Sequence, residues 1–306
     1  MSIAIVSPGK DPKPWLEALS QVDSSLDIQV YPQIVHPEKV EMALVWQHPP
    51  GYLRNFPHLK LISSLGAGVD HILTDPEIPH HLPIVRIVDE KLTWSMTNYV
   101  LMGVLNFHRQ LYRYQKDKEN GIWDMSNPEI SIKVGIMGVG ALGGDVVDKL
   151  MYLGFEVCGY GLSEKKGLPF PYYAKHRLDD FLSDINVLVC MLPLTSETEG
   201  ILNKTLFQKC NPGTYLINVA RGKHLIEEDL IPAIEEGCLA GAMLDVFRIE
   251  PLPRTHAFWS DPRIQLTPHI ASVTNPKAAA PQIVENFKRL TSGLTLQHQV
   301  NRVKGY

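Results

Sequence analysis

Three polar residues in the second half of the sequence have side chains suited to acid–base chemistry on a carbonyl group. Arg221 lies in NVARG, Glu250 in LDVFRIEP and His269 in TPHIAS, each just after an apolar run that predicts a buried strand. The carboxyl ends of parallel strands meet at one edge of a sheet, and ligands bind there. The three side chains are therefore expected to come together at such an edge.

Their functional groups match what the reduction of a keto group requires. Hydride transfer leaves negative charge on the carbonyl oxygen, and a protonated His269 could donate a proton to it, because histidine titrates near neutral pH. Glu250, bonded to the other ring nitrogen, would fix the tautomer and stabilise the charged ring. Arg221 offers a planar pair of donors for the carboxylate and carbonyl of a keto acid. A lone histidine after a proline is more often structural, and a lone arginine or glutamate in a loop is usually a solvated charge, so the prediction depends on all three.

A glycine-rich segment predicts where a dinucleotide binds. GVGALG, residues 138–143, follows a strand pattern and begins a helical pattern that continues to residue 153. In this setting the glycines permit a tight turn, close approach of a pyrophosphate and close packing of helix against strand. The N–H groups at the helix start would bind the phosphates. We expect contacts from Gly138, Gly140, Ala141, Leu142 and Gly143.

The residues after the next strand influence the choice between NAD and NADP. An acidic residue closing that strand would bind the adenosine ribose, whereas its absence beside cations suits a 2′-phosphate. Gly161 takes the acidic position, and LSEKK follows it. We predict that Ser163, Lys165 and Lys166 bind the phosphate and that NADPH is preferred. NADH is the alternative, because Glu164 could reach a ribose.

Three further residues or segments are candidates for ligand binding. Small residues in the segment 64–70 follow an apolar run and could expose successive backbone N–H groups to an anion, or form a plain turn. Trp46 follows another apolar run and could line a substrate pocket or belong to the core. Asp245 could contact the nicotinamide amide or cap the turn after it.

Alternating strand and helix patterns place these residues in a parallel α/β architecture. Five apolar runs in the first third are predicted strands, at 3–6, 28–31, 42–45, 59–63 and 84–88. Six more follow, at 132–137, 156–160, 187–191, 214–219, 240–244 and 264–267. Six is the number in a dinucleotide-binding doubly wound domain. The fold class is therefore α/β with two doubly wound parallel-sheet domains.

Helical patterns mark the boundary between the two domains. A pattern from Trp94 to about Lys118 is interpreted as one connector helix, and a final helix is predicted at about Pro276–Thr291. Pro232 should delay or kink the helix in HLIEEDLIPAIEEG. We expect residues 1–96 and 278–306 to form a flavodoxin-like substrate-binding and catalytic domain. A Rossmann NAD(P)-binding domain, residues 97–277, would be inserted into it.

Composition narrows the class of protein. The net charge of −4 argues against nucleic-acid binding. The four cysteines form no C-x-x-C pair, which predicts free thiols in a reducing compartment. No signal-peptide pattern starts the sequence, and no apolar stretch reaches the ~18–20 residues of a membrane span. We expect a cytoplasmic protein with neither membrane nor nucleic-acid partners, and we predict no metal site.

The motifs resemble those of the D-2-hydroxyacid dehydrogenase family over nearly the whole chain. LGAGVD, GVGALG, NVARG, GAMLDVF-x-x-EPLP and TPHIAS occur in that family's order. ALVWQHPP near residue 43, LDVFRIEPLP and the tail QVNRVKGY look like the bacterial glyoxylate/hydroxypyruvate reductase A subgroup. The resemblance implies NAD(P)H-dependent reduction of small 2-keto acids, namely glyoxylate to glycolate and hydroxypyruvate to D-glycerate.

The resemblance also implies residue roles and an assembly. Arg221, Glu250 and His269 would be catalytic. Trp46 would face the substrate, whose carboxylate would bind the backbone of Ala67, Gly68 and Val69. Further cofactor contacts would come from Leu192, Pro193, Thr198, Val219, Ala220 and Asp245. A homodimer built on the cofactor domains and a preference for NADPH are implied as well. The chain has Gly161-Leu162 where the subgroup has Ser-Arg, and Asn98 where many family members have Glu.

Other functions fit the same fold. An NAD(H)-sensing corepressor-like protein is one alternative, although the absence of an interaction tail favours an enzyme. A dehydrogenase acting on another substrate such as phosphoglycerate is a second; it would need extra cations and often carries a regulatory extension, for which a chain ending at Tyr306 leaves no room. Formate oxidation is disfavoured, because formate has no carbonyl oxygen that needs a proton donor.

Overall fold

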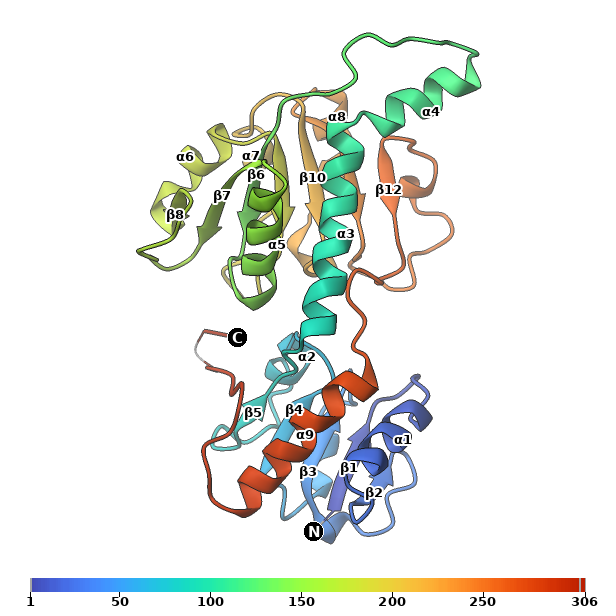
Figure 1. Cartoon of the computed structure of the whole chain (residues 1–306). Coiled ribbons are helices and arrows are strands. Elements are labelled where there is room, and N and C mark those ends of the chain that lie inside the picture. The colour runs from blue at the N-terminus through green and yellow to red at the C-terminus, as the bar shows by residue number, and fades with distance from the viewer. Residues whose placement is uncertain (1, 303, 306) are drawn as a thin grey trace. The chain divides into compact units, whose positions relative to one another are not determined.

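The chain forms two compact units, which are described separately (Figure 1). The computed structural model describes residues 2–302, 304 and 305. The first unit spans Met1–Leu92 and Val273–Tyr306, and the second spans Thr93–Ser272. These boundaries lie a few residues before those expected at 96/97 and 277/278. The second unit is therefore an insertion in the first.

The first unit is built on a five-stranded parallel sheet with the order β2-β1-β3-β4-β5. Its strands are β1 (Ser2–Val6), β2 (Asp27–Val30), β3 (Val40–Val45), β4 (Leu61–Ser64) and β5 (Ile84–Val85). Every strand overlaps a predicted apolar run. The central strands are buried because both faces of a parallel sheet are covered. The order 2-1-3-4-5 is that of flavodoxin-like sheets, so the expected class is confirmed.

The helices of the first unit tie the end of the chain to its beginning. α1 (Lys13–Val22) packs against α9 (Pro276–Thr291), and the two lie side by side in Figure 1. The side chain of Asn275 accepts hydrogen bonds from the N–H groups of Lys277 and Ala278, which starts α9 at the predicted residue. The short helix α2 (Asp70–Leu73) follows β4.

The second unit contains a seven-stranded parallel sheet with the order β12-β11-β10-β9-β6-β7-β8. Its strands are β6 (Lys133–Met137), β7 (Glu156–Gly161), β8 (Tyr172–Ala174), β9 (Val187–Cys190), β10 (Thr214–Asn218), β11 (Leu239–Leu244) and β12 (Ile264–Leu266). Counted from β6, the order contains the 3-2-1-4-5-6 arrangement of dinucleotide-binding sheets. The prediction of six strands was wrong by one. The missed strand is β8, whose three residues at the sheet edge are too few to give a recognisable apolar run.

The predicted single connector helix is two helices. α3 (Glu90–His108) ends before Gln110, which adopts a left-handed backbone with φ 55°, and α4 (Leu111–Glu119) follows it. A left-handed residue interrupts the helical hydrogen-bond ladder. α3 also begins earlier than predicted, because the carboxylate of Asp89 accepts a hydrogen bond from the N–H of Leu92. Among the described residues, no helix combines the length and the apolar character needed to cross a lipid bilayer.

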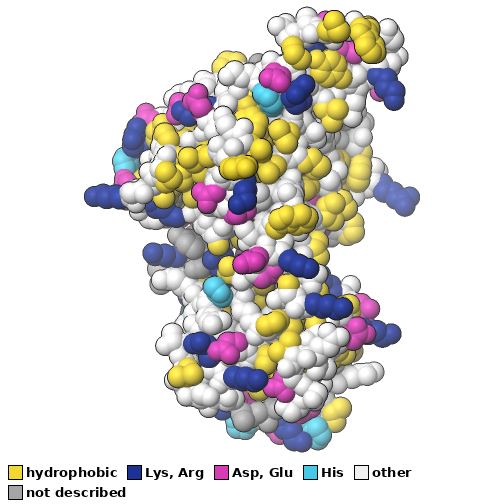
Figure 2. All heavy atoms as spheres, viewed as in Figure 1, with side chains coloured by type: hydrophobic (Ala, Val, Ile, Leu, Met, Phe, Trp, Pro, Cys, Tyr) yellow, Lys and Arg dark blue, Asp and Glu magenta, His cyan; other side chains and the backbone are white. Residues whose placement is uncertain are grey.

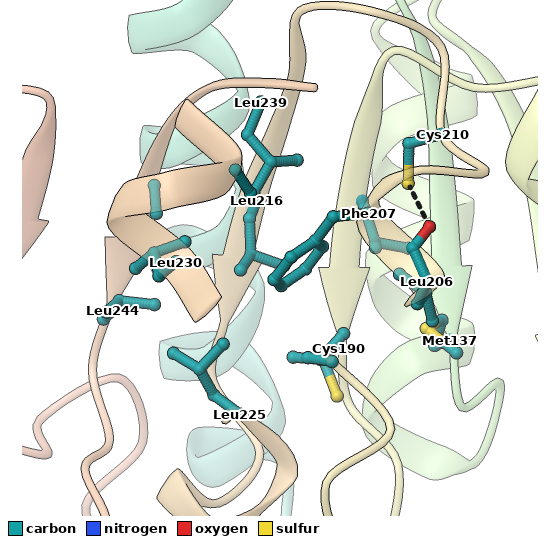
Figure 3. Close-up of a cluster of buried hydrophobic side chains, with 14 of the residues drawn as sticks. Met137, Cys190, Leu206, Phe207, Cys210, Leu216, Leu225, Leu230, Leu239 and Leu244 are labelled. Carbon is teal, nitrogen blue, oxygen red and sulfur yellow. Dashed lines mark hydrogen bonds between the residues drawn. The ribbon is translucent and has the colours of Figure 1, made fainter. Parts of the chain in front are cut away.

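The remaining helices of the second unit cover its sheet. They are α5 (Ala141–Tyr152), α6 (Leu178–Ser183), α7 (Lys204–Phe207) and α8 (Leu230–Glu235). α8 starts late, as one of the two outcomes expected for Pro232. Figure 3 shows Phe207 and Leu230 from α7 and α8 packed with Leu216 of β10 and with Leu225 from the loop after it. This core fixes the carboxyl ends of the central strands and the loops that leave them.

Candidate active site

Glu250 and His269 form a hydrogen-bonded pair in the second unit. Nδ1 of His269 lies 2.7 Å from Oε2 of Glu250, and the N–H of Phe247 donates to Oε1 at 3.0 Å. The side chains are 31% and 32% exposed, so solvent and small molecules can reach both. Within the described part of the chain, no group bonds Nε2 of His269. That nitrogen can therefore face a substrate.

The charge state of Glu250 suits this pairing. Burial by itself would raise the pKa of Glu250. The hydrogen bonds from His269 and Phe247 and the charges of His269 and Arg221 outweigh it, so the pKa stays below its usual value. Glu250 is therefore ionised at neutral pH and stabilises a protonated ring at His269.

A glycine brings the Arg221 loop against the Glu250 loop. Arg221 follows β10, and its guanidinium donates to the carbonyl of Ala220 at 2.7 Å. A Cβ on Gly222 would lie 1.8 Å from the backbone carbonyl carbon of Phe247, so only glycine permits this approach. The electrostatic influence of Arg221 on Glu250 agrees with the same proximity. The three residues singled out from the sequence thus gather at one edge of the sheet.

The backbone of His269 lies in the left-handed region, with φ 54°, which is strained for a residue with a side chain. Asp245, which follows β11, holds the loop in place. Its carbonyl accepts from the N–H of His269, and its carboxylate accepts from the hydroxyl of Thr267 and the N–H groups of Ile270 and Ala271, at 2.7–2.8 Å. Asp245 is 1% exposed, and burial raises its pKa. Its carboxylate therefore holds the loop that carries His269, rather than capping the turn directly after Asp245 as the structural alternative expected.

The glycine-rich turn has the geometry expected of a phosphate-binding site. Gly138 has a φ of 101°, and a Cβ on Gly143 would lie 2.1 Å from the carbonyl oxygen of Gly138. Helix α5 starts directly after Gly140, where the first N–H groups have no acceptor within the helix. A Cβ on Gly140 would meet no atom within 4 Å. Open space beside free helix-start N–H groups fits a pyrophosphate.

The other expected cofactor residues surround the loops after β9 and β10. Leu192, Thr198, Val219 and Ala220 are buried, and Pro193 is half-buried. The hydroxyl of Thr198 donates to the carbonyl of Pro193 at 2.6 Å and accepts from the N–H of Thr195. Thr198 thus shapes the loop that carries Leu192 and Pro193.

The segment after β7 carries the residues expected to bind a 2′-phosphate. The ammonium group of Lys165 donates to the carbonyl of Val139, which brings it to the glycine-rich turn. Ser163 and Lys166 are exposed. A Cβ on Gly161 would lie 2.2 Å from the hydroxyl oxygen of Tyr172, which itself donates to the carbonyl of Ser163.

The first unit holds the residues expected to bind substrate. Among the described residues, the N–H groups of Ala67, Gly68 and Val69 donate to no acceptor. The hydroxyl of Ser64 braces this turn by donating to the carbonyl of Gly68 at 2.7 Å. Three successive free N–H groups suit an anion.

Trp46 borders the same turn of the first unit. A Cβ on Gly66 would lie 2.7 Å from its indole ring, so the ring lies directly against the backbone of the turn. The side chain is half-buried, and the ammonium group of Lys10 lies 4.5 Å from the ring centroid. Trp46 is therefore placed beside the segment expected to bind the substrate's carboxylate.

Three residues that were not singled out from the sequence support these loops. Tyr99 of α3 bonds the hydroxyl of Thr267, Tyr172 of β8 covers Gly161, and His224 contacts the loops after β9 and β10. Tyr99 and His224 bond Thr267 and Pro193, which are distant in the sequence, and no spacing pattern predicts these contacts or that of Tyr172 with Gly161.

The sequence of the second unit matches a known family. Residues 101–271 match the family model described as D-isomer specific 2-hydroxyacid dehydrogenase, NAD binding domain. Glyoxylate/hydroxypyruvate reductase A of Serratia proteamaculans strain 568 is 39% identical to this chain, and the one of Yersinia enterocolitica strain 8081 is 37% identical. Each alignment covers 100% of both chains.

Solved structures agree with the sequence comparison. A D-isomer specific 2-hydroxyacid dehydrogenase from Xanthobacter autotrophicus Py2, in complex with NADPH and MES, superposes with a TM-score of 0.95 at 34% identity, covering 100% of this chain and 99% of that one. An NADPH-dependent glyoxylate/hydroxypyruvate reductase from Sinorhizobium meliloti, in complex with NADP and sulfate, gives 0.92 at 36% identity and full coverage of both chains.

Proposed function

The chain belongs to the family of D-isomer specific 2-hydroxyacid dehydrogenases, and from this premise we propose that it reduces glyoxylate to glycolate and hydroxypyruvate to D-glycerate with NADPH. The observation that carries the proposal is the 2.7 Å bond between ionised Glu250 and His269, with the Arg221 loop packed beside it. The names of relatives that match along their whole length support this choice of substrates.

The residues present fit a dinucleotide in the second unit. The open space at Gly140 and the start of α5 would hold the pyrophosphate, and the loops at Pro193 and Ala220 would contact the rest of the molecule. Reduced nicotinamide, when bound, supplies a hydride for the keto carbon. The solved relatives that contain NADPH or NADP support NADPH as the cofactor, with NADH as the alternative.

The residues of the proposed site divide proton transfer and substrate binding among them. His269 donates a proton from Nε2 to the keto oxygen, while Glu250 holds Nδ1–H and stabilises the charged ring. Arg221 binds the keto acid through its planar fork and polarises the carbonyl. In the first unit, the N–H groups of Ala67, Gly68 and Val69 bind the substrate's carboxylate, and Trp46 faces the substrate.

Initial rates with glyoxylate, hydroxypyruvate and pyruvate, each with NADPH and NADH, test the proposed function. The largest kcat/KM is expected for glyoxylate or hydroxypyruvate with NADPH. Nucleotide binding without turnover of any keto acid would instead identify the chain as an NAD(P)(H)-sensing binding protein.

Replacing Lys165 and Lys166 together by alanine is expected to weaken NADPH binding about 10-fold and NADH binding little. The reason is that a 2′-phosphate loses charge-assisted hydrogen bonds that NADH never makes. Fluorescence titration of both nucleotides measures the difference. Lys175→Ala is the control, because this exposed lysine pairs with Glu197. Equal weakening of both nucleotides would remove these lysines from phosphate recognition.

We propose a homodimer built on the second unit. The segment after α4 exposes Ile122, Trp123 and Met125, and the side chains of Trp123 and Met125 are 90% and 78% exposed. Figure 2 shows hydrophobic side chains gathered at the top of the view, over α4 and the segment after it. Apolar surface of this kind is stabilised by contact with a partner.

Trp123→Ser combined with Met125→Ser should convert the dimer to a 34.4 kDa monomer in sedimentation equilibrium. The control is Val35→Ser, since this valine is 75% exposed in the first unit. A dimer that persists in the double variant would place the interface elsewhere.

The cytoplasm is the compartment that we propose. All four cysteines are free, and Cys158, Cys190 and Cys210 are buried as thiols in the core of the second unit. Unpaired thiols are typical of proteins in a reducing environment.

A further inference from the structure

His224 lies on the loop after β10 and contacts the loop after β9, and these two loops carry expected cofactor and substrate contacts. It belongs to the turn Gly222–His224 directly after Arg221 and is 0% exposed. Nδ1 of its ring lies 3.2 Å from the backbone nitrogen and 3.1 Å from the carbonyl oxygen of Arg221, and Nε2 lies 3.3 Å from the carbonyl oxygen of Pro193. The ring therefore touches both loops with its two polar atoms.

The partners of the ring select one tautomer. Nδ1 contacts both the N–H and the carbonyl of Arg221, whereas the carbonyl of Pro193 can only accept. A hydrogen bond at each ring nitrogen of the neutral ring therefore requires the proton on Nε2. In the neutral ring Nδ1 then accepts from the N–H of Arg221. His224 is thus a donor toward the Pro193 loop and an acceptor toward the Arg221 loop.

Backbone contacts and core packing keep the ring in this position. The N–H groups of Gly200 and Leu202 donate to the carbonyls of Lys223 and His224, both at 2.9 Å. Leu225, the next residue, is buried in the core among the side chains drawn in Figure 3. The imidazole consequently has little freedom to turn away from its two partners.

We propose that His224 is a positioning residue. Its Nε2 holds the loop around Pro193 in the position that binds the nucleotide, and its Nδ1 holds the backbone of Arg221 in the position that binds the keto acid. This inference rests on the proposed function. Because the two bonds are made by different atoms, substitutions that retain one atom at a time should separate the two effects.

Three variants test this directly. His224→Leu removes both polar atoms and is expected to raise the dissociation constant of NADPH and the KM of the keto acid about 5-fold each, the scale of one hydrogen bond. His224→Gln places an amide donor near Nε2 and should restore nucleotide binding only. His224→Asn places an amide oxygen near Nδ1 and should restore KM only.

The readouts separate positioning from a purely structural role. NADPH dissociation constants come from fluorescence titration, and KM and kcat come from initial rates, with thermal unfolding recorded for every variant. Lys223→Ala is the control, because this exposed side chain is on the same turn. If all three variants change both constants in step with their unfolding temperatures, His224 is only structural and the proposal fails.

Two further outcomes are informative. If His224→Leu folds and leaves both constants within 2-fold of wild type, the bonds have no effect on binding and the proposal is overturned. If the wild-type chain binds NADPH but turns over no keto acid, the proposed function fails. In that case the NADPH dissociation constants of His224→Leu and His224→Gln still show whether His224 positions the loop around Pro193.

Discussion

Replacing His269 by alanine should lower kcat at least ~100-fold, while NADPH still binds with unchanged affinity. The variant lacks the proposed proton donor for the keto oxygen, and general acid catalysis contributes at least that factor. Glu250, whose pKa is held low in part by His269, cannot replace it, because an ionised carboxylate has no proton to give. Stopped-flow or steady-state rates with glyoxylate, together with NADPH titration, measure both quantities.

The left-handed backbone at His269 decides which controls are informative. His269→Asn should be as inactive as alanine, although asparagine tolerates this conformation. His298→Ala is the matched control, because His298 is exposed in the first unit and has a similar φ of 53°. A near-normal kcat in either His269 variant would remove this residue from the chemistry.

Arg221→Ala should lower kcat/KM at least ~100-fold, and Arg221→Lys should recover little of it. The planar guanidinium makes two parallel hydrogen bonds to a carboxylate, and a lysine ammonium cannot reproduce that geometry. In the proposed site the guanidinium also polarises the carbonyl, so kcat should fall and KM should rise.

Arg248→Ala distinguishes this role from a general effect of positive charge. Arg248 precedes Glu250 by two residues but pairs with Glu228 and is exposed. It should leave kcat/KM within about 2-fold of wild type. Full recovery in Arg221→Lys would mean that a point charge suffices and that the bidentate interaction is not made.

Sequence patterns predicted the fold wherever burial leaves a continuous apolar run. Every predicted strand exists, and α9 has the predicted bounds, since Asn275 and Pro276 mark its start. β8 was missed because three residues at a sheet edge give no period. The break at Gln110 was missed because its left-handed backbone depends on contacts with the segment around Asn127 rather than on residue type.

The sequence predicted those residues of the candidate site that directly follow strands. Arg221, Glu250 and His269 follow strands, and strand ends share an edge, so topology alone brings them together. The sequence did not decide the role of Asp245, because a buried carboxylate after a strand can bind a ligand or accept hydrogen bonds from the backbone of a loop. His224 was beyond prediction, since its partner Pro193 lies on a different loop.

The contact between Gly161 and Tyr172 limits how this chain can change its nucleotide preference in evolution. Any acidic side chain at position 161 has a Cβ, and that Cβ would lie only 2.2 Å from the phenol oxygen of Tyr172. The phenol ring is held at both ends, because its hydroxyl donates to Ser163 and its edge lies against Gly159. The effects of substitutions at the two positions therefore depend on each other. An NAD-selective descendant with an acidic residue at position 161 requires that Tyr172 is replaced first or at the same time.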